Sequence, residues 1–179
     1  MKHIFLTLFA LLTFISCKEE AKKDETVEAP KEKIVDLKVI CKVKVLNDDS
    51  YQLFFKEDLD VSLPFKEENS VWVEFKGSEN VQDIVFELPE NVFPNFFRID
   101  TGVNPKNENV QILSMTIVYK DKSFEILPAK YNDFFFTTEF IKDLNPADGT
   151  FKTVPKGEAF DPHFFSGDNL RYELEKLFK

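Results

Sequence analysis

The feature that most constrains the fold is an alternation of apolar and polar side chains in residues 35–45. The apolar side chains stand at every second position: Val35, Leu37, Val39, Cys41, Val43 and Val45. Successive side chains of a β-strand point to opposite faces, so this pattern predicts a strand with one buried face. Cys41 lies on that face, and we expect it to be an inert small hydrophobe rather than a reactive thiol.

Shorter stretches with strand patterns follow, separated by turn residues. They cover residues 51–55, 70–76, 81–88, 93–100, 110–119, 123–127 and 134–141, with a short edge strand expected around 61–65. The turn at residues 77–80 predicts that the strands on either side of it form a hairpin. Residues 110–119 alternate less cleanly, which favours burial on both faces.

The C-terminal part is less regular. Residues 142–167 contain three prolines and three glycines, which are typical of loops, and His163 is interpreted as a loop residue rather than a catalytic base. After Asp168, a candidate N-cap, leucines and a phenylalanine recur at helical spacing: Leu170, Leu174, Leu177 and Phe178. The sequence therefore predicts an all-β, antiparallel, jelly-roll-like β-sandwich with a short C-terminal helix.

The first residues have the character of a signal peptide. A short basic start precedes an apolar run at Ile4–Ile15, which is too short to cross a hydrocarbon layer of about 30 Å. The following Ser16-Cys17 resembles a bacterial lipobox, which implies acylation of Cys17 as the new N-terminus. Lys18-Glu19-Glu20 resembles the export signal that takes lipoproteins of the Bacteroidota to the outer face of the outer membrane. The resemblance implies a lipid-anchored protein of the outer membrane that faces the extracellular side.

These patterns divide the chain into three parts. Residues 1–16 are the expected signal peptide, residues 17–33 a lipid-anchored tether, and residues 34–179 one β-sandwich domain. The tether mixes both charges with almost no large apolar side chain, so we expect it to be disordered; a short charged helix before Pro30 is the alternative.

Composition excludes several classes of function. The 179 residues carry a net charge of −9, and removal of residues 1–16, which contain Lys2 and no acid, leaves 22 basic and 32 acidic residues. Such an acidic chain argues against a nucleic-acid partner and against binding to anionic lipid by charge. Cys41 is the one cysteine left besides Cys17, and His163 the one histidine left besides His3, so a disulfide, most zinc sites and a Ser/His/Asp triad are not expected.

The segment 94–119, PNFFRIDTGVNPKNENVQILSMTIVY, resembles jelly-roll modules attached to bacterial glycosyltransferases and surface proteins. Phe97-Arg98-Ile99-Asp100 matches the end of one strand of those modules, and Val110–Ile117 matches the next strand. The expected hairpin before this segment stands where such modules have one. The modules are similar in shape to carbohydrate-binding modules, so the resemblance implies a sandwich of that type without naming a ligand.

Four side chains are candidate ligand-binding residues. Trp72 lies on the polar face of its expected strand, where it either forms a stacking platform for a sugar ring or is covered by the chain or a partner. Arg98 and Asp100 share a face and either contact sugar hydroxyls or form an ion pair that holds the next loop. Tyr119 is a weaker platform candidate, as are Tyr51 and Tyr131.

Acidic loops leave two further functions open. The expected loops contain hard oxygen ligands of the kind calcium takes, without the spacing of an EF-hand: Asp48, Asp49 and Glu108, with Asp100 and Asn104 nearby. A glycosidase needs two carboxylates across a cleft, and with 32 acidic residues the sequence neither identifies nor excludes such a pair. We expect no cofactor, with calcium as the alternative.

These observations favour a non-catalytic surface binding protein, with a glycan as the preferred ligand and the outer membrane as the site of its acyl anchor. A structural or protein-interaction subunit of an outer-membrane assembly is the alternative. An enzyme ranks third, because the chain lacks most catalytic residue types outside carboxylates.

Overall fold

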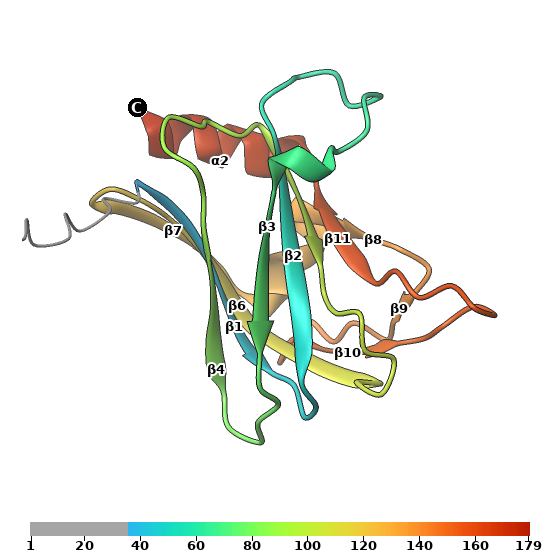
Figure 1. Ribbon diagram of the computed structural model, residues 1–179. Helices are drawn as coiled ribbons and strands as arrows, with labels where there is room; N and C mark the ends of the chain where they lie inside the picture. Colours follow the sequence, from blue (N-terminus) through green and yellow to red (C-terminus); the bar gives the residue numbers. More distant parts are fainter. Residues whose placement is uncertain (1–35) are drawn as a thin grey trace, which may run out of the picture. The chain divides into compact units, whose positions relative to one another are not determined.

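The computed structural model describes residues 36–179, and these residues form two antiparallel β-sheets packed as a sandwich (Figure 1). The predicted signal peptide, the tether, Cys17 and Lys18-Glu19-Glu20 lie outside the described residues. The predicted all-β sandwich with a C-terminal helix is confirmed.

Each sheet contains strands from both halves of the described chain. Sheet A has the order β4 (Gln82–Glu87), β1 (Leu37–Lys44), β6 (Asn109–Tyr119), β10 (Thr150–Thr153) and β9 (Ile141–Lys142), with β7 (Lys122–Ile126) also paired to β6. Sheet B has the order β3 (Ser70–Phe75), β2 (Asp49–Lys56), β5 (Phe96–Asp100), β11 (His163–Ser166) and β8 (Phe135–Thr137). Short helical segments complete the fold: η1 (Glu67–Asn69), η2 (Pro128–Lys130), α1 (Tyr131–Phe134) and α2 (Asp168–Phe178).

Strand β1 forms within the alternating segment of residues 35–45. Leu37, Val39, Cys41 and Val43 are buried between the sheets, and β1 pairs with β4 on one side and β6 on the other. Burial raises the pKa of the Cys41 thiol to about 12. Cys41 is therefore an inert core residue in the structure.

The prediction that β6 is buried on both faces is wrong. Its buried side chains alternate in two halves, and the alternation shifts between Ser114 and Met115, which are both buried. In the pairing with β1, Lys42 faces Ser114 while Val43 faces Ile112, so Leu113 is an extra residue on β6. This β-bulge reverses the alternation at one point and explains why the pattern looked irregular in the sequence.

The predicted hairpin of residues 70–76 and 81–88 is also wrong. Both strands exist, but β3 pairs with β2 in sheet B and β4 pairs with β1 in sheet A. The connection between them crosses the sandwich beside the β1–β2 connection, where Ser78 N–H donates to Val45 O at 2.7 Å. A Cβ on Gly77 would lie 2.3 Å from Leu46 O, so only glycine permits this close approach.

Several short elements differ from the sequence prediction. No strand forms around 61–65, where the chain makes a turn instead, and residues 134–141 divide into the end of α1, β8 and the start of β9. The expected loop 142–167 contains β10 and β11. Strands β8 to β11 have only two to four residues each, too few to show a periodicity between neighbouring glycines and prolines.

Helix α2 lies across one end of the two sheets (Figure 1) and buries Leu170, Leu174 and Leu177. Gly167, rather than the predicted Asp168, is the N-cap, and Asp168 is the first helical residue. A carboxylate at that position still interacts favourably with the positive end of the helix dipole. Within residues 36–179, no helix is sufficiently long and apolar to cross a membrane.

The carboxylate of Asp49 connects the β1–β2 turn to the loop between β5 and β6. Its Oδ1 accepts backbone N–H bonds from Ser50 at 2.9 Å, Val103 at 2.8 Å and Asn104 at 3.1 Å. Its Oδ2 accepts a bond from Asn107 Nδ2 at 2.8 Å. Four donors around one largely buried carboxylate hold the loop at the end of sheet B.

Replacement of Asp49 by alanine should destabilise the domain by about 2–4 kcal/mol, because it leaves four donors without their charged acceptor. Urea unfolding followed by the fluorescence of Trp72 measures this change. Asp121→Ala, at an exposed turn, is the matched control and should change the free energy of unfolding by less than about 0.5 kcal/mol. Equal effects of the two substitutions would show that the Asp49 bonds contribute nothing specific.

Candidate functional site

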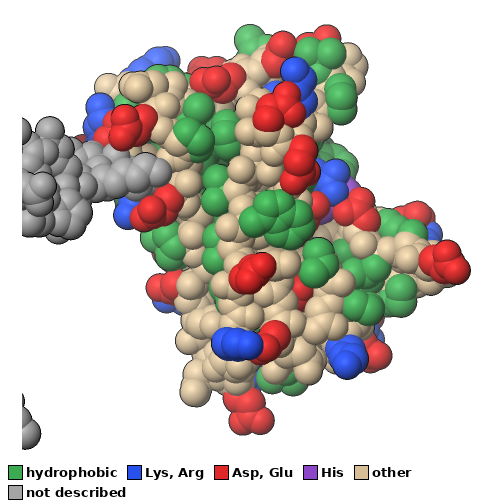
Figure 2. Space-filling view, viewed as in Figure 1, with side chains coloured by type: hydrophobic (Ala, Val, Ile, Leu, Met, Phe, Trp, Pro, Cys, Tyr) green, Lys and Arg blue, Asp and Glu red, His purple; other side chains and the backbone are tan. Residues whose placement is uncertain are grey.

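The outer face of sheet B is the candidate functional site, since strand pairing gathers most of the candidate side chains there. One row across the strands contains Trp72, Gln52, Asp100 and His163, and the next contains Ser70, Phe54, Arg98, Phe165 and Phe136. Figure 2 shows hydrophobic side chains over β2 and β3 with acidic side chains among them. The face therefore combines aromatic surfaces with polar groups.

Trp72 is partly exposed on β3, with 49% of its surface accessible. Its indole N–H donates to Glu67 Oε1 at 3.2 Å, which fixes one edge of the ring. The same carboxylate oxygen accepts a bond from Gln52 Nε2 at 2.8 Å, and Gln52 also donates to Ser70 Oγ at 2.9 Å. The tryptophan is thus oriented by neighbours and still presents aromatic surface to solvent.

Arg98 forms the most extensive charged cluster on this face. Its Nε and Nη2 donate to the two oxygens of Asp100 at 2.7 and 2.8 Å, and Nη2 also donates to Asp161 Oδ1 at 2.8 Å. The guanidinium lies 5.2 Å from the ring centre of Phe54, close enough for a cation–π contact. The predicted ion pair of Arg98 and Asp100 is present within β5. The bond from Arg98 to Asp161 connects β5 to the loop before β11, whereas the prediction had the pair hold the loop that follows Asp100.

Burial of Asp100 raises its pKa, although the hydrogen bonds and charge of Arg98 act in the opposite direction. Desolvation disfavours the ionised carboxylate, and the guanidinium compensates only part of that cost. Arg98 is therefore the main neighbour that favours the charged form of Asp100, against the effect of burial.

His163 is the first residue of β11, not a loop residue as predicted. Its Nδ1 lies 3.1 Å from Asp161 O and 3.3 Å from Asp161 Oδ1. Three possible ligand atoms lie within 4.8 Å of one another, one each from His163, Asp100 and Asp161. A metal ion could bridge atoms at this spacing. However, the guanidinium of Arg98 already binds both carboxylates. A metal ion would have to displace this guanidinium, or bind against the repulsion of its positive charge.

The predicted calcium ligands do not converge in the structure. The oxygens of Asp49 are used by the four donors described above, and those of Asp48 accept bonds from Lys76 Nζ at 2.6 Å and Gly77 N–H at 3.0 Å. Glu108 belongs to a different connection, the end of the loop between β5 and β6. Among residues 36–179, the group of acidic and histidine side chains with metal-ligand spacing is the one at His163 instead.

The tyrosine platform candidates are buried, which corrects the prediction for Tyr119. Tyr119 packs edge-to-face against Phe93 and Phe178 at ring-centre distances of 6.1 and 5.2 Å. Tyr51 lies in the core, and Tyr131 is buried with its hydroxyl donating to Ile112 O at 2.9 Å. Tyr51 and Tyr119 stand at inward positions of β2 and β6, and Tyr131 is buried at the start of α1, so none of the three rings is free to stack on a sugar.

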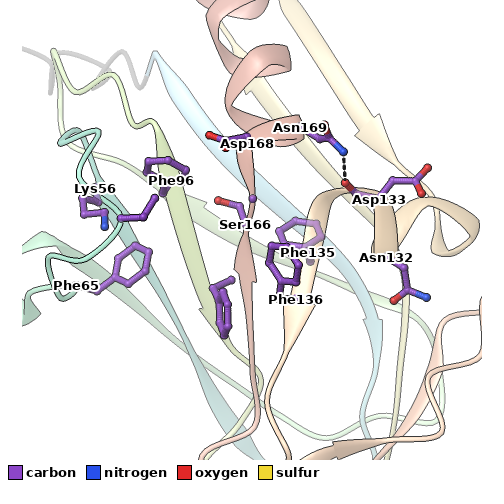
Figure 3. Close-up of a pocket in the computed structure, with 13 residues that line it drawn as sticks. Lys56, Phe65, Phe96, Asn132, Asp133, Phe135, Phe136, Ser166, Asp168 and Asn169 are labelled. Carbon is purple, nitrogen blue, oxygen red and sulfur yellow. Dashed lines mark hydrogen bonds between the residues drawn. The ribbon is translucent and has the colours of Figure 1, made fainter.

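A pocket of about 470 Å³ opens at the end of β2, and sequence reasoning missed it entirely (Figure 3). The side chains that define it are those of Lys56, Phe65, Phe96, Phe135, Phe136 and Phe165. Phe136 and Phe165 stand side by side on β8 and β11, with ring centres 5.9 Å apart. The sequence shows that phenylalanine is abundant. It could not show that these phenylalanines lie together, because their arrangement depends on β11, and the sequence predicted a loop in that place.

The segment on which the family resemblance was based forms β5, the loop around Asp49 and β6. These two strands belong to different sheets, so the segment spans the sandwich. Comparison of the chain with protein-family models, with curated proteins and with solved structures found no match. The relation to Bacteroidota lipoproteins and to sugar-binding modules stays a prediction.

Arg98→Gln should destabilise the domain by about 2 kcal/mol at pH 7, because Asp100 then lies largely buried without its counter-ion. The loss should shrink as pH falls. A raised carboxyl pKa means that the folded state holds the proton more tightly than the unfolded state. The stability that comes from this proton is therefore present at low pH and is lost as pH rises through the folded pKa. Urea titrations between pH 4 and 8 measure this dependence. In Arg98→Gln/Asp100→Asn the pH-dependent part should vanish; its persistence would assign it to another group.

Proposed function

We propose that this protein is a non-catalytic, lipid-anchored cell-surface binding protein that binds a glycan on the outer face of sheet B. The observation that carries the proposal is the setting of Trp72: an oriented, half-exposed indole on a face that also contains amide, carboxylate and guanidinium groups. Sugar rings are bound in this way, with their C–H faces on an aromatic ring and their hydroxyls on polar side chains.

The polar neighbours of Trp72 are suited to hydroxyl groups. Glu67 lies exposed beside the indole and is held there by the buried amide of Gln52, and Asp100 follows in the same row across the sheet. Planar side chains that already hydrogen-bond to each other are pre-organised, which lowers the entropy cost of ligand binding. This arrangement supports recognition of a polar ring compound over a purely apolar one.

A binding role fits the carboxylates better than catalysis does. Asp100 and Asp161 both bind the guanidinium of Arg98, at 2.7–2.8 Å. A glycosidase needs one carboxyl group to give a proton and another to act as nucleophile or base. Two carboxylates that share one permanent cation are not divided into these roles.

The anchor is proposed from the N-terminal sequence alone. Ser16-Cys17 after the apolar run implies acylation, and several acyl chains on one protein hold it firmly to a membrane. Lys18-Glu19-Glu20 supports a position on the outer surface, where glycans are accessible.

Trp72→Ala should weaken glycan binding at least fivefold, by about 1 kcal/mol or more of lost stacking, and should lower the free energy of unfolding by less than about 1.5 kcal/mol because half of the ring is exposed. The full chain in polymer-bounded nanodiscs, probed on a glycan array and then titrated with the best ligand, provides the measurement. Trp72 is the only tryptophan, so the protein's indole emission reports on this site alone. The emission should shift to the blue on binding, because the ligand covers the ring.

Tyr172→Ala is the matched control, because Tyr172 is equally exposed on α2 and lies outside sheet B. It should leave binding unchanged. A glycan that binds Trp72→Ala as tightly as the wild type would place the site elsewhere, and an array with no retained glycan would contradict the proposal.

Mass spectrometry of the N-terminal peptide should show an acylated Cys17, and Cys17→Ala should release the protein from the membrane fraction. In contrast, replacement of Lys18, Glu19 and Glu20 by alanine should leave the protein on membranes but remove its access to protease added to intact cells. An unmodified N-terminus would contradict the anchor, and unchanged protease access would contradict the export signal.

A protein-interaction subunit is the second candidate, supported by the exposed phenylalanine pair of Phe136 and Phe165. Exposed aromatic clusters are common at protein interfaces. Crosslinking in cells followed by capture distinguishes the two: a stoichiometric protein partner that is lost in Phe136→Ser and retained in Trp72→Ala would favour this candidate.

A further inference from the structure

The pocket at the end of β2 is a second site on the outer face of sheet B. Lys56 lies two outward positions beyond Gln52 on the same strand, roughly 13 Å along it. The pocket is therefore separate from the polar surroundings of Trp72, and a ligand bound in it is independent of the proposed glycan function. Its volume of about 470 Å³ lies within the range of small-molecule sites.

The walls of the pocket are mainly aromatic (Figure 3). Phe65 and Phe96 lie near Lys56, and Phe135 and Phe136 lie on the other side of Ser166. Phe136 is 60% exposed, so part of the aromatic surface faces solvent. Such walls favour an apolar ligand, whereas a neutral sugar would leave several hydroxyls without partners.

Lys56 is a nearly buried cation, with 8% of its surface exposed. Its ammonium donates to Asp60 O and Leu63 O, both at 3.0 Å, and lies 5.1 Å from the ring centre of Phe65 and 5.3 Å from that of Phe96. An ammonium has three N–H groups, and these two bonds use two of them. Among the described residues Lys56 forms no salt bridge, which is unusual for a buried charge.

The acidic side chains of the pocket are already paired. Asp133 accepts a bond from Lys130 Nζ at 2.8 Å, and Asp168 lies 3.1 Å from Arg171 Nε. The first turn of α2 also borders the pocket, and its dipole adds positive potential. The Asp60 carboxylate on the adjoining loop is close enough for the charge of Lys56 to help lower its pKa, but it accepts bonds from Ser62 and forms no ion pair with Lys56. The cation of the pocket without a direct carboxylate contact is accordingly Lys56.

We propose that this pocket binds an apolar carboxylate, with the carboxylate on the third N–H of Lys56 and the hydrocarbon body against the phenylalanines. A carboxylate supplies the missing counter-ion, and one free donor suits a single anionic oxygen. The loop 57–66, whose carbonyls hold the other two N–H groups, forms one wall of the site.

Isothermal titration of the full chain in polymer-bounded nanodiscs, with empty nanodiscs as the blank, tests the proposal with three probes of equal chain length. Octanoate should bind, octanol should bind about 10- to 100-fold more weakly for want of the charged hydrogen bond, and octylammonium should not bind measurably. Equal affinities for octanoate and octanol, tighter binding of octylammonium, or no binding of octanoate up to millimolar concentrations would overturn it.

Two variants locate the site. Lys56→Met keeps the length of the side chain and should reduce octanoate affinity to that for octanol, whereas Lys66→Met, at an exposed lysine of the same loop, should change nothing. Phe136→Ser should weaken both octanoate and octanol with little loss of stability, because Phe136 is largely exposed. If Lys56→Met does not fold, the Phe136→Ser result with the three probes still decides: octanoate binding that is unaffected by Phe136→Ser would exclude this pocket.

Discussion

Packing between the two sheets is the interaction on which the rest of the structure depends. Cys41 is the one cysteine of residues 36–179 and is unpaired, so no disulfide holds this part of the chain together. Large side chains such as Phe86, Phe97, Phe151 and Phe164 are fully buried instead, each contributing about 1.5–3 kcal/mol by leaving water. The inner faces of the strands supply this stability, which leaves the outer face of sheet B free to carry exposed aromatic and charged groups.

Side-chain alternation predicted which segments form strands but not how they pair. Residues 37–44 were read correctly because one face of β1 is buried against the other sheet and the opposite face is largely polar. The same pattern in β3 and β4 could not show that they belong to different sheets, because alternation identifies the buried face of a strand and says nothing about its neighbour. Strands as short as β8 and β11 carry no usable period at all.

The candidate site follows the same division. The exposure of Trp72 and the pair of Arg98 and Asp100 could be considered from the sequence, because both depend on neighbours along one strand. Gln52 beside Trp72, and Asp161 bound to Arg98, come together only through strand pairing and loop position between distant parts of the chain. The pocket around Lys56 is a stronger case, since its aromatic walls come from four separate segments of the chain.

The buried thiol of Cys41 makes the protein its own reporter of structural opening. Burial raises the pKa of the thiol to about 12, which disfavours the reactive thiolate at neutral pH, and the sulfur is not accessible to solvent in the closed sandwich. Because Cys41 faces the other sheet, labelling of this position requires the two sheets to separate near β1. The rate at which a maleimide reacts with Cys41 would measure how often the two sheets come apart.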